Sequence, residues 1–183
     1  MLWRVLKDDY HFEKIFNLGF IILSVFLLNS FILKYLLSEY WFWINLFSLV
    51  LASLFIIKRQ KMKFFEILNA MVIGLLPWLS MIYINDAINN SSLSSFVIFW
   101  VVLICVFLYF FSSANYRRFS WYKSGRIGFS GIVAALIFFL FRFVSAFLNS
   151  SIISYVGVLE VYFSGSTTLL LIIMLYNLST HKE

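Results

Sequence analysis

The feature that most constrains this chain is a series of six apolar runs, each about as long as a helix that crosses a bilayer. A bilayer core about 30 Å thick is crossed by about 20 apolar residues in helical form. The runs cover residues 15–37, 40–57, 64–84, 95–113, 129–148 and 162–178. Since 63% of the 183 residues are hydrophobic and 12% are charged, no soluble core could hide this much apolar surface. We therefore predict an all-α, polytopic membrane protein with a bundle of about six transmembrane helices.

Lysine and arginine are concentrated at one set of helix ends. Twelve of the 14 cations lie before the first run, between the second and third, between the fourth and fifth, or after the sixth. They are Arg4, Lys7, Lys14, Lys58, Arg59, Lys61, Lys63, Arg117, Arg118, Lys123, Arg126 and Lys182. Because Lys and Arg in short loops stay on the cytoplasmic side, we predict that both termini are cytoplasmic, with residues 1–14 a lead-in and residues 179–183 a tail.

The segments that join the predicted spans on the opposite side carry acidic residues instead. They hold Glu39, Asp86 and Glu160 and no cation. We predict a polar loop at residues 85–94 (NDAINNSSLS) and a mixed loop at residues 149–161 that is either re-entrant or interfacial.

Composition and spacing argue against several functional classes. The net charge of +6 follows the topology, so it does not indicate nucleic-acid binding. His11 and His181 lie in polar segments with no Cys or carboxylate at ligand spacing, so we predict neither a metal nor another cofactor. Cys105 is the single cysteine and forms no intramolecular disulfide. There is no evident internal repeat and no set of intramembrane polar residues, so a transporter is not predicted.

Two cations lie inside the predicted spans, where a charge is costly enough to suggest a function. Lys34 is one turn from the outer end of the first span, and we expect its side chain to reach the headgroups. Arg142 lies 13 residues after the start of the fifth span at residue 129, too deep for this escape. We expect it to face the bundle interior, in contact with a lipid phosphate or a substrate, or paired with an outer carboxylate such as Glu160.

Three stretches of the chain carry a family resemblance. They are HFEKIFNL at His11–Leu18, LFIIKRQKMKFFEILNAMVIGLLP at Leu54–Pro77 and LFRFVSAFL at Leu140–Leu148. Their order is a cytoplasmic lead-in, a basic turn that leads into a span, and a helix with an arginine. In this layout the chain resembles prolipoprotein diacylglyceryl transferase, the bacterial membrane enzyme that moves diacylglyceryl from phosphatidylglycerol to a lipobox cysteine thiol. The alignment omits the family's first span, which agrees with a cytoplasmic amino terminus.

The residues at the family's signature positions differ in this chain. Trp43 stands at the position of the family's histidine, and Ala146 at that of the glutamate after the matched arginine. Diacylglyceryl transfer needs cations that hold the phosphate and neutralise the departing glycerol phosphate, and an indole supplies no such charge. The resemblance therefore implies a divergent relative whose catalytic residues are unknown.

For the site, the resemblance implies lipid phosphate binding. Arg142 matches the family's arginine and is the implied phosphate anchor, with Tyr83, Asn85 and Asp86 as replacement ligands. The implied partners are phosphatidylglycerol and a lipoprotein precursor, and the implied location is the bacterial cytoplasmic membrane. The alternative, from a different class, is a noncatalytic membrane scaffold or accessory subunit that binds lipid or a partner membrane protein.

Overall fold

The computed structural model describes residues 11–36, 38–115, 128–148 and 152–180, and every long element among them is an α-helix. The helices are α2 (Phe12–Leu36), α3 (Trp41–Gln60), α4 (Phe64–Asn89), α5 (Leu93–Asn115), α6 (Phe129–Leu148) and α7 (Val158–Thr180), with a short 3-10 helix η1 (Ser38–Tyr40) before α3. All six α-helices are long and apolar enough to cross a membrane. The predicted fold class, an all-α bundle of six membrane-spanning helices, is therefore confirmed.

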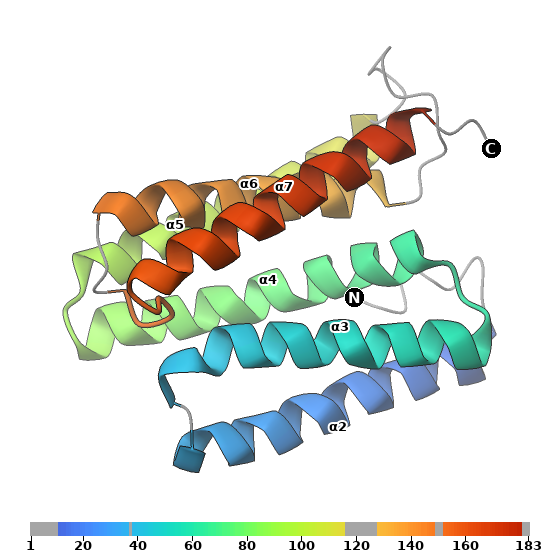
Figure 1. The fold of residues 1–183 in the computed structure, drawn as a ribbon, viewed down its shortest axis with the longest axis horizontal. Coiled ribbons are helices and arrows are strands. Elements are labelled where there is room, and N and C mark those ends of the chain that lie inside the picture. Colours follow the sequence, from blue (N-terminus) through green and yellow to red (C-terminus); the bar gives the residue numbers. More distant parts are fainter. Residues whose placement is uncertain (1–10, 37, 116–127, 149–151, 181–183) are drawn as a thin grey trace.

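The helices run alternately up and down the bundle (Figure 1). The α2–α3 and α4–α5 connections lie at one end, whereas the start of α2, the α3–α4 turn and the end of α7 lie at the other. The exposed cations Lys58, Arg59, Lys61 and Lys63 flank or form the α3–α4 turn, so we call this end the basic end and the opposite one the outer end.

By the charge rule, we expect the basic end to face the cytoplasm. The other cations of that prediction lie outside the described residues, apart from Lys14. They are Arg4, Lys7, Arg117, Arg118, Lys123, Arg126 and Lys182, and residues 1–10 of the predicted lead-in and 181–183 of the predicted tail also lie outside.

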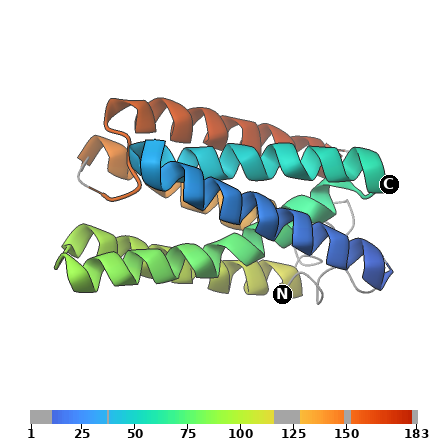
Figure 2. The same ribbon diagram turned by 90° about the horizontal axis from the view of Figure 1, so that it is seen from below.

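The hairpin of α2 and α3 lies against one side of the other four helices (Figures 1 and 2). Its outermost helix, α2, keeps a row of large apolar side chains exposed, among them Phe16, Phe20, Leu23 and Leu27. Lipid tails are as apolar as leucine, so in a bilayer this exposure carries no penalty. Helix α2 is the least buried of the six described helices.

Helices α4 and α6 approach each other closely at a small residue. A Cβ atom added to Gly131 would lie 2.6 Å from Asn69 Oδ1 and 2.7 Å from Asn69 Cα. Beside this contact, Ser130 Oγ donates a hydrogen bond of 3.1 Å to Asn69 Oδ1. Small residues that let helix backbones approach, together with interhelical hydrogen bonds, are the usual means of helix association in membranes. This contact fixes α6, and with it Arg142, against α4.

The predicted outer loops are shorter in the structure. Helix α4 continues to Asn89 instead of ending before Asn85, because side chains four residues apart support its last turns. Asn89 Nδ2 donates to Asn85 Oδ1 (3.1 Å), and Asn90 Nδ2 donates to Asp86 Oδ1 (2.7 Å). Helix α7 begins at Val158, within the predicted loop at 149–161, of which residues 149–151 lie outside the described residues.

Candidate functional site

Arg142 lies in α6 with a fully buried side chain, and protein atoms accept hydrogen bonds from all three of its guanidinium nitrogens. Nε donates to Glu160 Oε1 at 2.8 Å. Nη1 donates to Tyr83 Oη at 3.0 Å and to Ser154 Oγ at 2.8 Å. Nη2 donates to the Ser154 carbonyl oxygen at 3.0 Å and lies 2.6 Å from Glu160 Oε1. Four hydrogen bonds and the ion-pair contact thus engage all three nitrogens of the guanidinium.

Glu160, in the first turn of α7, is the counter-ion of Arg142, and its side chain is also fully buried. Its second oxygen, Oε2, accepts a hydrogen bond of 2.8 Å from Trp43 Nε1, and Ser164 Oγ donates to Oε1 at 2.5 Å. Removing an ion pair from water is expensive unless further hydrogen bonds satisfy both partners. Here they do, and we call Arg142, Glu160, Tyr83, Ser154 and Trp43 the buried charge cluster.

Aromatic rings surround the guanidinium. Its Cζ atom lies 3.8 Å from the ring centre of Phe42, 4.6 Å from that of Tyr155 and 5.8 Å from that of Phe138. These distances are within the range of cation–π attraction. The rings exclude water and lower the local dielectric constant, which strengthens the Arg142–Glu160 attraction.

Tyr155 lies in residues 152–157, between the two helices that carry the ion pair. Its hydroxyl and that of Ser145 form a hydrogen bond. Burial raises the pKa of the Tyr155 hydroxyl to about 12, although the Arg142 guanidinium acts in the opposite direction. The hydroxyl therefore stays protonated at neutral pH, and Arg142 has Glu160 as its negatively charged partner.

The structure brings two of the four predicted site residues together. Tyr83 and Arg142 are hydrogen-bonded, whereas Asp86 bonds Ser95 and Asn90, and Asn85 is exposed and bonded to Asn89. The side chains of Asp86 and Asn85 thus stabilise the connection between α4 and α5. The side chain of Lys34 lies outside the described residues.

Several residues around Arg142 were not predicted as site residues. Trp43 entered the sequence argument only as a departure from the family's histidine, yet its N–H binds Glu160. The spacing of Glu160 and Ser164, four residues apart on one helix, is a signal that could have placed both on the same buried face. Ser154 gave no signal, because its contact with Arg142 depends on the path of the segment between α6 and α7.

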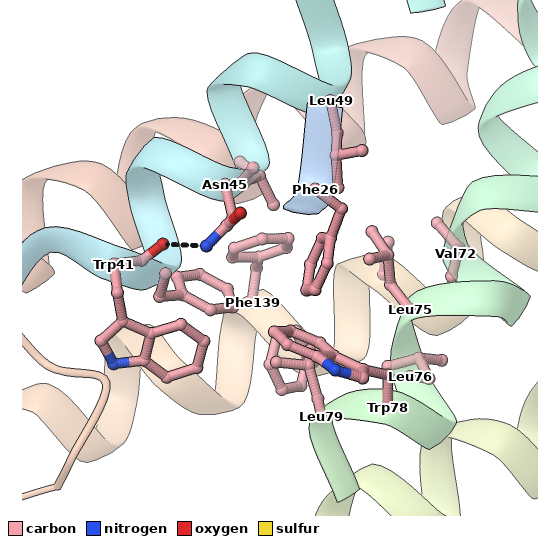
Figure 3. A pocket seen from close by; sticks show the side chains of 14 residues that line it. Phe26, Trp41, Asn45, Leu49, Val72, Leu75, Leu76, Trp78, Leu79 and Phe139 are labelled. Atoms are coloured by element: carbon pink, nitrogen blue, oxygen red, sulfur yellow. Dashed lines mark hydrogen bonds between the residues drawn. The ribbon is translucent and has the colours of Figure 1, made fainter. Parts of the chain in front are cut away.

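A cavity of about 70 Å³ adjoins the cluster, and a second, larger cavity of about 270 Å³ shares lining residues with it. Both are lined by Phe26 of α2, Leu49 of α3, and Leu75 and Trp78 of α4, and we call the two together the interhelical groove. Figure 3 shows the smaller cavity, with the rings of Phe26 and Trp78 in edge-to-face contact at its wall. Leu23, at the edge of the larger cavity, is 63% exposed, so the groove opens between α2 and α4 towards the bilayer.

The groove and the buried charge cluster share a wall. Phe42 and Phe138 line the smaller cavity and also lie against the Arg142 guanidinium. On the far side, the groove reaches the backbone of α4, since a Cβ atom added to Gly74 would meet no atom within 4 Å. The groove is therefore an apolar space that runs from the bilayer to the aromatic shell of Arg142.

Comparisons with known proteins add no functional assignment. No protein-family model matches the chain, and no curated protein and no solved structure is significantly similar to it.

Proposed function

We propose that this protein is a noncatalytic, integral membrane accessory protein that holds a membrane lipid between its helices. The observation that carries the proposal is the contrast between its two candidate sites. Arg142, the implied phosphate anchor, already has protein acceptors at all three guanidinium nitrogens and Glu160 as its counter-ion. The interhelical groove, by comparison, is apolar, about 270 Å³ in its larger part, and open to the bilayer.

The size and lining of the groove suit an apolar chain. An apolar cavity of about 150 Å³ is enough to bind benzene, and each methylene group that leaves water contributes about 0.8 kcal/mol. Within a bilayer this gain is largely absent, since lipid tails are themselves apolar. Retention then depends on packing against the walls, which include the aromatic side chains of Phe26 and Trp78.

The experiment is retention of lipid by the purified protein. The chain is extracted in detergent, and bound lipids are counted by native mass spectrometry for wild type and for Gly74→Phe, which projects a ring into the larger cavity. We expect a lipid adduct on wild type that is lost in Gly74→Phe. Equal adducts on both proteins, or none on either, would contradict the proposal. Gly74→Ala is the matched control, since a methyl group there meets no neighbour.

Diacylglyceryl transfer from phosphatidylglycerol to a lipobox cysteine is the competing proposal, in the bacterial cytoplasmic membrane. What favours it is the contact between Arg142 and Tyr83, two residues that the family resemblance assigns to lipid binding. What weighs against it is that Glu160 already neutralises Arg142. Incubation of the protein with phosphatidylglycerol and a lipobox peptide decides between the two, because transfer adds the mass of diacylglyceryl to the peptide. We expect no mass shift.

A further inference from the structure

One buried polar atom beside the groove has no partner. Asn45, in α3, lines the smaller cavity and is 6% exposed. Its Nδ2 donates a hydrogen bond of 2.8 Å to the Trp41 carbonyl oxygen. Its Oδ1 is buried and accepts no hydrogen bond from any described residue. Figure 3 shows this oxygen turned away from Trp41, towards the side of the cavity where Phe26 and Phe139 lie.

The orientation of the amide is fixed by chemistry. A flipped amide would place Oδ1 against the Trp41 carbonyl oxygen, and two acceptors cannot form a hydrogen bond. The unpaired Oδ1 therefore lies just behind the wall of the smaller cavity, which Asn45 helps to line. Leaving a buried acceptor unpaired is destabilising, and polar residues inside a membrane are functional hypotheses by default.

The missing partner must be a hydrogen-bond donor attached to an apolar body. A bound water needs two to four polar partners, and apart from Asn45 the polar side-chain groups that line the smaller cavity are two indole N–H groups. That of Trp41 donates to the Ile153 carbonyl oxygen, and that of Trp78 lies on the side of its ring away from Asn45 (Figure 3). A phospholipid acyl chain carries no donor, and an ionised fatty acid carries none either. A hydroxyl group at the end of a long chain supplies one donor for the one acceptor.

We propose that the groove binds a single-chain lipid alcohol, with its chain between α2 and α4 and its hydroxyl donating to Asn45 Oδ1. This inference rests on the proposed lipid-holding function and names the class of lipid. Because the wall side chains enclose the oxygen, the hydroxyl reaches it when one of them changes rotamer. Phe26 belongs to α2, the least packed helix, so the hairpin supplies the movable wall.

The test uses two photoreactive probes of equal chain length, a long-chain alcohol and its methyl ether, which lacks the donor. We expect the full-length protein in detergent to be labelled by the alcohol about tenfold more than by the ether, the ratio that corresponds to about 1.4 kcal/mol for one hydrogen bond. Asn45→Leu should reduce this ratio to about one while the ether still labels the protein. Gly74→Phe should abolish labelling by both probes.

Ser48→Ala is the matched control. Ser48 lies one turn from Asn45 on α3 and also donates to the carbonyl four residues back, that of Ile44, but it does not line the groove. Its variant should keep the wild-type ratio. Equal labelling of wild type by alcohol and ether would overturn the alcohol assignment and leave the lipid-holding function standing. No labelling by either probe would overturn both. The wild-type comparison decides the question even if Asn45→Leu fails to fold.

Discussion

Arg142 and Glu160 form an ion pair in which Nη2 and Oε1 are 2.6 Å apart and neither side chain is exposed. The pair joins α6 to α7, and the Trp43 indole joins α3 to the same carboxylate. The charge of Arg142 in α6 thus holds three helices together. We expect its substitution to change the stability of the protein.

Removal of one charge of the Arg142–Glu160 pair should lower the free energy of unfolding much more than removal of both. Arg142→Ala leaves Glu160 buried without its counter-ion, for which we expect a loss of about 3–5 kcal/mol in the free energy of unfolding. Glu160→Gln should be similarly harmful, whereas the double variant Arg142→Met/Glu160→Gln should lose less than either. Unfolding in mixed micelles, followed by tryptophan fluorescence, measures this. A double variant as unstable as the sum of its parts would contradict the pairing.

The Trp43 hydrogen bond to the carboxylate should also be measurable. Trp43→Phe keeps an aromatic ring and removes the N–H, so we expect a loss of about 1.5–3 kcal/mol, the range for hydrogen bonds to charged groups. Trp41→Phe is the comparison, since the Trp41 N–H donates at 3.2 Å to the neutral carbonyl of Ile153. It should cost about 1 kcal/mol or less. The same unfolding assay applies, and equal losses would argue against a charged acceptor for Trp43.

Substitution by alanine should have opposite effects on thermal stability at Gly131 and at Gly74. Gly131→Ala places a Cβ atom 2.6 Å from Asn69 Oδ1, so α4 and α6 must separate and the midpoint of thermal unfolding should fall. Gly74→Ala meets no atom within 4 Å and gains up to about 1 kcal/mol from helix propensity. Differential scanning fluorimetry of the two variants beside wild type is sufficient. A stable Gly131→Ala protein would show that this helix contact is not tight.

Orientation can be tested with cysteines at opposite ends of the bundle. Arg59 and Asn89 are both exposed, whereas the native Cys105 is buried. In cells, we expect a membrane-impermeant maleimide to label Asn89→Cys and to spare Arg59→Cys until the membrane is opened. The reverse pattern would place the basic end outside and contradict the charge rule for this chain.

The long apolar runs were sufficient to predict six helices, because a bilayer leaves the backbone few alternatives. The position of Arg142 within the fifth apolar run likewise predicted that it is buried among the helices, and Glu160 was one of the partners considered. Asn85 and Asp86 were grouped with Arg142 through the family resemblance alone, but the side chains of the last turns of α4 bond one another. The contact with Ser154 and the groove beside Asn45 depend on the path of a connecting segment and on how the hairpin packs, which no local pattern encodes.

The position of the counter-ion also has a consequence for biosynthesis. Ribosomes make α6 before α7, so Arg142 enters the membrane 18 residues ahead of the carboxylate that neutralises it. Until the later helix arrives, the arginine must stay near the translocon or the headgroups, and a nascent chain stopped before Glu160 holds a lone positive charge in hydrocarbon. Completion of the ion pair thus makes assembly of α6 with the helices before it depend on synthesis of α7.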